Sequence, residues 1–234
     1  MWSGHAFADM LADGADRWAL FESFVAEWHD PLSAADGLPE DDIVRAEQRL
    51  GLALPEALRT WYRLAGRRLD LGGYQDRLLP PGRLQIAHDV LVFYVESHRA
   101  VEWGVRASDL SRGDPPVVIA DPEVLGRRVW LPEAGRLSDF ALLSVLRETI
   151  TFGRWMALAI AGERLIEETV LHDCWPLLFP PSHWPKYPTA FYAGTNAIAL
   201  TCPGMVQIAA RNEATLAELL SRTPPGVEWE RERP

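Results

Sequence analysis

The stretch from Asp41 to Gly66 constrains the fold more than any other part of this chain, because it encodes two short helices and a fixed linker. Asp41 or Asp42 is expected to cap the first helix, and Gly51 suits the left-handed turn that ends it. Its apolar face is Ile43, Ala46 and Leu50. Pro55 is tolerated in the first turn of the second helix. That helix has its apolar face at Leu58, Trp61, Tyr62 and Ala65. The linker between the helices, residues 52–55, is too short to adopt many conformations. The pattern therefore predicts two helices that pack on one core at a fixed angle.

The rest of the chain alternates between helical and strand periodicity. An amphipathic helix is predicted over 16–29, and residues 90–96 and 100–106 are predicted to form an antiparallel hairpin. Further strands are predicted at 117–119, 127–131, 189–193, 197–202 and 205–210. Further helices are predicted from Ser138, with Ser138 as cap and a course that continues past Gly153 toward 161, over 163–175, and after the capping residue Asn212.

This order of elements predicts an α+β fold, because the strands follow one another as antiparallel neighbours and the helices are segregated from them. We expect a mainly antiparallel sheet flanked by helices, with a C-terminal extension of three strands and a helix. The expected divisions are an N-terminal helix and linker at 1–37, a central domain at 38–152, and an extension at 153–234 that packs on it.

The two-helix stretch resembles the N-terminal signature of the SUKH superfamily, which includes yeast cell-wall regulators and many bacterial immunity proteins. The matching residues are Ile43, Ala46, Glu47, Leu50, Gly51, Leu54, Pro55, Leu58, Trp61 and Gly66. Trp103, Gly104, Val105 and the run 114–117 are similar to one bacterial branch of that group, and so is the segment 184–194. The turn at 96–99 departs from that branch, where Glu-Asn-Gln-Gly is expected. The resemblance covers about residues 38–220 and implies a SUKH-like fold.

Charge limits the class of partner. The formal net charge is −10, and Lys186 is the only lysine among 23 basic residues. Non-specific binding to nucleic acid is driven by Lys and Arg neutralising phosphates, so an acidic chain is not expected to bind it. Acidity suits a basic protein partner, and it equally suits simple solubility.

The sequence contains none of the common catalytic or phosphate-binding motifs, such as a nucleophile elbow, a zinc-protease helix or a Walker loop. His172 and Cys174 are the only closely spaced pair of metal-ligand type, and two groups do not complete a zinc site. Cys174 and Cys202 are expected to be thiols. We therefore expect no enzyme activity, no cofactor and no metal. Without a signal sequence or a membrane span, a cytoplasmic location is expected.

What the resemblance implies is a protein that binds another protein without catalysis: an immunity protein that occludes the active site of a cognate toxin, such as a nuclease. A regulator or scaffold on the same fold is an alternative, and an enzyme with a dispersed site is a remote one. The binding face is predicted near the hairpin and the loop 107–126, where carboxylates surround aromatic residues as in an interface hot spot. The candidate residues are Tyr94, Glu96, Glu102, Trp103, Asp114, Asp121, Glu123 and Trp130.

Overall fold

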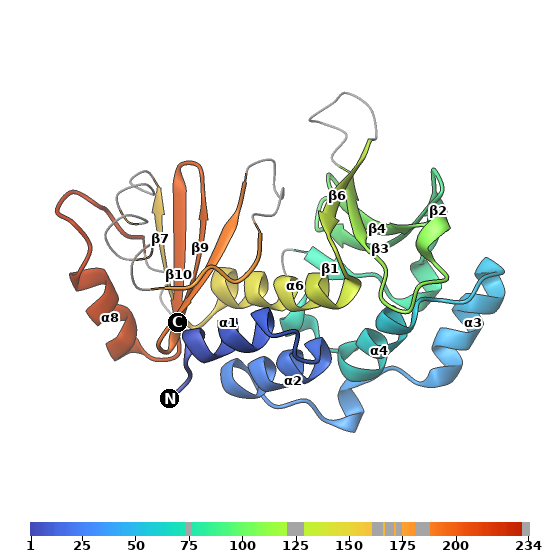
Figure 1. Cartoon of the computed structure of the whole chain (residues 1–234), viewed down its shortest axis with the longest axis horizontal. Helices are drawn as coiled ribbons and strands as arrows, with labels where there is room; N and C mark the ends of the chain where they lie inside the picture. The colour runs from blue at the N-terminus through green and yellow to red at the C-terminus, as the bar shows by residue number, and fades with distance from the viewer. Residues whose placement is uncertain are drawn as a thin grey trace. The chain divides into compact units, whose positions relative to one another are not determined.

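The computed structural model describes residues 1–73, 76–120, 129–160, 166, 171, 175–180 and 188–230 (Figure 1). The chain divides into two compact units, and the division does not follow the chain order. One unit joins residues 1–28 to residues 149–234, and the other consists of residues 29–148. We call them the terminal unit and the central unit.

The central unit holds an antiparallel sheet with strand order β1-β3-β4-β5-β6, and β2 pairs with β3 beside this path. Its strands are β1 (Asp76–Leu78), β2 (Gln85–Ala87), β3 (Val90–Glu96), β4 (Glu102–Arg106), β5 (Val117–Ala120) and β6 (Trp130–Ala134). Its helices are α3 (Glu40–Leu50), α4 (Glu56–Ala65) and the part of α6 (Leu137–Phe152) that ends at Glu148. Short 3-10 turns lie at Ala34–Asp36, Leu69–Leu71, Pro81–Arg83 and Ala107–Asp109.

An aromatic cluster forms the core of the central unit. Trp61 of α4 stacks on Tyr94 of β3 with ring centroids 5.7 Å apart, and the Phe140 ring of α6 meets both. Phe93 and Tyr94 are neighbours in sequence, yet both rings contact Trp61 and Phe140. A β-bulge explains this, because the pairing of β3 with β4 shifts between Val92 and Tyr94. Strict alternation of side chains between the two faces of a strand therefore breaks down at this bulge.

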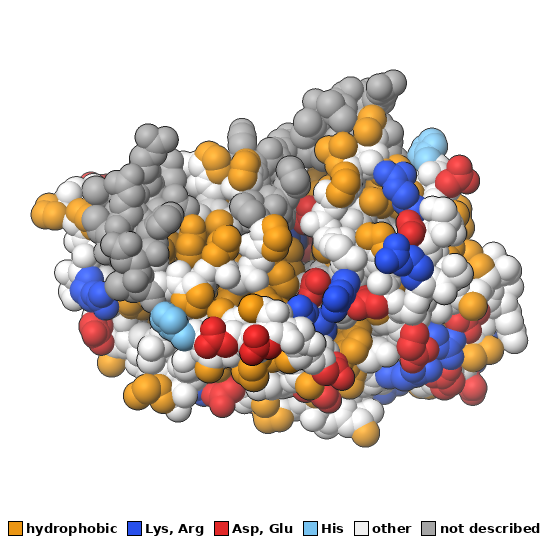
Figure 2. Space-filling model, viewed as in Figure 1, with side chains coloured by type: hydrophobic (Ala, Val, Ile, Leu, Met, Phe, Trp, Pro, Cys, Tyr) orange, Lys and Arg blue, Asp and Glu red, His pale blue; other side chains and the backbone are white. Residues whose placement is uncertain are grey.

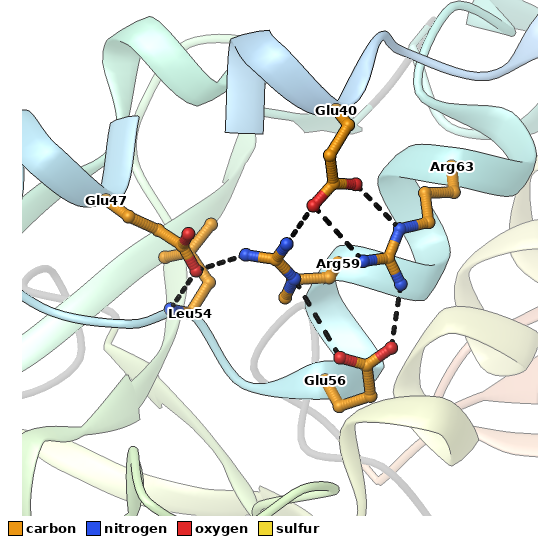
Figure 3. Close-up of polar contacts among 6 residues, drawn as sticks. All are labelled: Glu40, Glu47, Leu54, Glu56, Arg59 and Arg63. Atoms are coloured by element: carbon orange, nitrogen blue, oxygen red, sulfur yellow. Dashed lines mark hydrogen bonds and ion pairs between the residues drawn. The ribbon is translucent and has the colours of Figure 1, made fainter. Parts of the chain in front are cut away.

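Glu47 fixes the linker between α3 and α4. Its carboxylate accepts hydrogen bonds from the Leu54 amide at 2.8 Å and from Arg59 Nη1 at 2.5 Å (Figure 3). Glu40 and Glu56 pair with Arg59 and Arg63 in the same network. The Glu-x-x-Leu-Gly-x-x-Leu-Pro run thus has a structural purpose: one carboxylate of the first helix holds the start of the second.

The terminal unit is built on a second antiparallel sheet with strand order β7-β10-β9-β8. Its strands are β7 (Trp155–Ile160), β8 (Ala190–Gly194), β9 (Ala197–Cys202) and β10 (Met205–Ala210), and its helices are α1 (Gly4–Ala12), α2 (Arg17–Trp28) and α8 (Glu213–Ser221). Ile208, Val206 and Ala199 pack with Leu216 and Leu219 of α8 in one core. Gly4 lies so close to β8 that an added Cβ would be 2.3 Å from the Ala193 carbonyl carbon.

The predicted α+β class is confirmed, with two antiparallel sheets and helices beside them. The strands at 90–96, 197–202 and 205–210 have the predicted bounds, and the Asn212 side chain caps α8 by accepting from the Thr215 amide. Gly51 has the expected left-handed φ of 70°. Asp41 and Asp42, however, lie within α3, because its N-cap is Pro39.

Two elements differ from expectation. The helix from residue 138 does not pass Gly153, because α6 ends at Phe152 and residues 155–160 pair along their whole length with β10. The short helix α1, which buries Gly4, Phe7 and Leu11, was not predicted. The expected helix at 163–175 and the start of the strand at 127–131 lie largely outside the described residues.

The expected division of the chain also differs. The N-terminal helices share a unit with the C-terminal strands, and they are not a separate segment at 1–37. Long-range contacts explain this: the Trp2 amide donates to Asn196 Oδ1 at 2.9 Å, and Glu27 pairs with Arg211 at 2.7 Å. In the described part of the chain, no helix has the length and apolar content that a membrane span needs.

Candidate functional site

The turn of the predicted binding hairpin is organised by Glu96. Its carboxylate accepts hydrogen bonds from the Ser97 hydroxyl at 2.8 Å and from the amides of His98 and Ala100 at 2.8 and 3.2 Å. Arg99 takes a positive φ of 59°, and its amide donates to the Glu96 carbonyl. Burial raises the pKa of Glu96, but these hydrogen bonds outweigh that effect and lower it. One carboxylate thus closes the turn without the Asn and Gly expected there.

The aromatic residues of the predicted face lie inside the central unit. Tyr94 and Trp103 are fully buried, and Trp130 is 9% exposed. Their rings pack against the core, with Tyr94 and Trp103 in edge contact at 5.5 Å. Arg106, the last residue of β4, donates a hydrogen bond to the Trp130 carbonyl at 2.9 Å. Because every residue of β3 is buried, neither face of this strand reaches the surface.

The carboxylates of the predicted face are also used within the fold, as far as the structure describes them. Glu102 is 5% exposed in β4. Asp114 accepts hydrogen bonds from the amide and hydroxyl of Ser138, at 2.9 and 2.5 Å, and so holds the first turn of α6. Ser138 therefore lies inside the first turn of α6, and the group that caps its amide is the Asp114 carboxylate, which comes from outside the helix. Asp121 and Glu123 lie outside the described residues.

The prediction of exposed aromatic anchors is thus corrected for Tyr94 and Trp103, since both side chains are enclosed by the sheet and α6. The physical reason is the central position of β3 and β4 in the sheet, where all of β3 and most of β4 are buried whichever face a side chain is on. Binding of a partner by the surface around this hairpin stays a prediction.

The structure instead brings together a buried polar cluster that the sequence did not predict. Asp76 of β1 is fully buried, and its Oδ2 lies 3.2 Å from Nη1 of Arg147, which is 2% exposed. The Asp76 amide donates to Glu148 Oε1 at 3.2 Å. The Arg147 guanidinium also lies over the Trp103 ring, 5.8 Å from its centroid. The cluster therefore sets two acids and one arginine against the aromatic core.

Burial controls the ionisation of this cluster. Loss of water around Asp76 raises its pKa to about 6, although the charge of Arg147 opposes the rise. Glu96, which pairs in register with Asp76 across β1 and β3, adds to the rise through its negative charge. Burial, together with the charges of Asp76 and Glu148, likewise raises the pKa of the Tyr94 phenol well above its usual value. Asp76 is thus an acid whose ionisation falls near neutral pH.

Such a group has the proton affinity of a general acid or base, but catalysis also requires that a substrate reach it. Asp76 has no exposed surface. Among the residues that the structure describes, no group of three His, Cys, Asp or Glu side chains is placed to hold a metal ion. Cys202 is a buried thiol, while His172 and Cys174 lie outside the described residues. The observed role of the cluster is to tie β1 to α6.

A sequence signal for the cluster exists in hindsight. Residues 141–150 are buried throughout, and Arg147 and Glu148 are the charged residues in this otherwise mostly apolar helical stretch. A charged pair in such a place needs partners, since an unpaired buried charge is strongly unfavourable. The identity of the partner, Asp76, could not be derived because it lies 71 positions before Arg147 in the sequence.

Comparison with known proteins adds no family assignment. The sequence matches no model of a protein family, and it matches no curated protein.

Proposed function

We propose that this chain is a protein-binding module without catalysis of its own, and that it acts as an immunity protein against a cognate basic toxin. The observation that carries the proposal is the pair of helices α3 and α4, joined through Glu47 at the positions where the sequence resembles SUKH proteins. The resemblance supplies the class of function, and the net charge of −10 supplies the expected sign of the partner.

The surface charge is unevenly placed. Over α3 and α4 the acidic side chains lie among arginines, as the lower right of Figure 2 shows, and the pairs of Glu40, Glu47 and Glu56 account for much of this. The exposed described part of the hairpin region carries Arg99, Arg106 and Arg112. Among the residues that the structure describes, this region is therefore not the most acidic surface.

Residues 1–28 hold five acidic residues and one basic residue. All five carboxylates are exposed: Asp9, Asp13, Asp16, Glu22 and Glu27. The basic residue, Arg17, donates to the carbonyls of Ala15 and Leu11, each at 2.9 Å. Acidic side chains are visible over α1 in the lower part of Figure 2. This surface of α1 and α2 suits first encounter with a basic partner, because long-range attraction raises the association rate.

The proposal predicts a toxin gene beside this gene, and the test is protection of cells that express that toxin. Wild-type chain should protect, and its association with the purified toxin should slow as salt rises. Asp9→Arg combined with Asp13→Arg should slow association, whereas the same charge change at Asp30 and Asp41 of the central unit should have a smaller effect. The same experiment with Asp109→Arg probes the hairpin region. Glu102→Arg is unsuitable, because Glu102 is buried and its reversal would disturb the fold.

Absence of protection and of binding would reject the immunity proposal and favour a regulator or scaffold. The remote alternative is an enzyme with a dispersed site, and Asp76, whose pKa burial raises to about 6, is the acid to test, although it has no exposed surface. Under that alternative, the purified chain would turn over a substrate, and Asp76→Asn would abolish turnover while Glu56→Gln, a change at an exposed carboxylate, would not.

A further inference from the structure

A groove lies between α3 and the proline turn at 80–82 in the central unit. It has a volume of about 320 Å³ and is lined by Leu38, Asp42, Arg45, Ala46, Arg49, Pro80, Pro81 and Gly82. The α3 residues at 42, 45, 46 and 49 follow helical spacing, so they form one wall. Leu38, Ala46 and the two prolines make much of the lining apolar.

Arg49 is held in place across this groove. Its Nη2 donates to the carbonyls of Pro81 and Leu84, at 3.1 and 2.8 Å. These two bonds leave the Nε and Nη1 hydrogens of the guanidinium without an acceptor in the part of the chain that the structure describes. A guanidinium that is already fixed loses little freedom when it binds an acceptor, so its remaining donors are prepared for one.

The charge of the groove is positive within an acidic chain. Asp42 and Arg45 neutralise each other as an i, i+3 pair. Arg49 has no ion pair with any described carboxylate, and neither has the exposed Arg83 that follows Gly82 in the turn. The groove therefore presents one fixed cation, Arg49, beside an apolar lining of Leu38, Ala46 and the two prolines, which complements a carboxylate next to an apolar side chain.

We propose that this groove binds an acidic segment of a partner protein, with a carboxylate on Arg49 and a neighbouring apolar side chain against Leu38, Ala46 and the prolines. The proposal is independent of the proposed function, because it concerns a different surface and an anionic partner. The volume suits one or two side chains, so the groove is a site for a short linear segment.

The probe is a short peptide in which two glutamates alternate with leucines, and its matched twin carries glutamine at both acidic positions. Each is titrated into the full-length, 15N-labelled chain, and the Arg49 Nε–Hε and Gly82 amide signals are followed. The acidic peptide should shift both signals to saturation, and the glutamine twin should not. Arg49→Gln should weaken binding about tenfold or more, because a charge-assisted pair is lost. Arg77→Gln, the same change at an exposed arginine that does not line the groove, should leave binding unchanged.

A second pair of variants tests the location without altering Arg49. A Cβ added at Gly82 would meet nothing within 4 Å, so side chains are accommodated there. Gly82→Glu places a competing carboxylate at the rim and should weaken peptide binding about tenfold, while Gly82→Gln should have little effect. The proposal is overturned if the acidic peptide causes no saturable shift, if the twin binds equally, or if both Gly82 variants bind alike. Saturable binding of inorganic phosphate without binding of the peptide would overturn the assignment of a peptide carboxylate.

Discussion

Arg147 Nη1 lies 3.2 Å from Asp76 Oδ2 in the core of the central unit, and the two side chains are 3% and 0% exposed. The pair joins a three-residue strand to a helix of the same unit. It does so at a cost, because both charges are removed from water and Asp76 remains harder to ionise than an ordinary aspartate.

This cost predicts a pH dependence of stability. The pKa of Asp76 is about 6 in the folded chain and 3.8 when unperturbed, so between these values the folded state binds more protons than the unfolded state. Stability contributed by this group is therefore fully present below pH 3.8 and is lost as pH rises through about 6, by about 3 kcal/mol in all. Urea unfolding of wild type and Asp76→Asn between pH 4.5 and 7.5 measures it. The free-energy difference should move in favour of Asn as pH rises, and parallel curves would contradict the assignment.

Trp61→Ala is predicted to lower the free energy of unfolding by about 3 to 5 kcal/mol, because truncation of a buried aromatic ring leaves a cavity. Trp61 is 2% exposed and contacts Tyr94, Phe93 and Phe140. Chemical denaturation of the full chain, followed by circular dichroism, gives the value. Leu69→Ala is the control, because Leu69 is 72% exposed and its truncation should change stability by less than about 0.5 kcal/mol. Equal changes in unfolding free energy for the two variants would show that Trp61 of α4 is not packed in the core.

Gly104→Ala is predicted to destabilise the β3–β4 hairpin. An added Cβ would lie 2.3 Å from Val90 Cγ1 and 2.6 Å from the Leu91 carbonyl oxygen, so the strands must move apart. Overpacking of this kind costs about 1 to 3 kcal/mol, and more when backbone is the obstacle. Gly113→Ala is the matched control, since nothing lies within 4 Å of its added Cβ. The melting temperature should fall for the first variant alone, and an unchanged value would mean that the hairpin is less closely paired.

Glu47→Gln is predicted to lower stability by about 1 to 3 kcal/mol, because it weakens the bonds to Arg59 and the Leu54 amide. Burial raises the pKa of Glu47, but those two bonds and the charge of Arg59 outweigh it, so the pKa lies below its usual value of 4.5. The stability from this carboxylate is therefore present above pH 4.5 and is lost as pH falls through its lower folded pKa. Glu56→Gln changes an acid whose side chain is 62% exposed and should have a smaller effect. Chemical denaturation at pH 7 compares the two variants. An equal loss of unfolding free energy in both would show that Glu47 contributes no more to stability than the exposed Glu56.

The sequence by itself determined the local structure wherever one pattern dominated. The apolar spacing of α3 and α4, the left-handed Gly51 and the Asn212 cap each depend on a few neighbouring residues, and the structure confirms them. The antiparallel hairpin of β3 and β4 was predicted for the same reason. These features follow from backbone geometry and side-chain spacing, which are local properties of the chain.

Only the tertiary structure decided what the charged and aromatic side chains do. Trp103 and Tyr94 are residue types that suit both an interface anchor and a core, and the tertiary structure decided between the two by covering both faces of β3 and most of β4. Asp76 pairs with Arg147, and the N-terminal helices share a unit with the C-terminal sheet, although these residues are far apart in the sequence. Local periodicity carries no information about contacts between such distant segments. Burial and pairing over such distances set both the packing and the pKa values, because the free energy of a charge or a ring depends on its final surroundings and not on its neighbours in sequence.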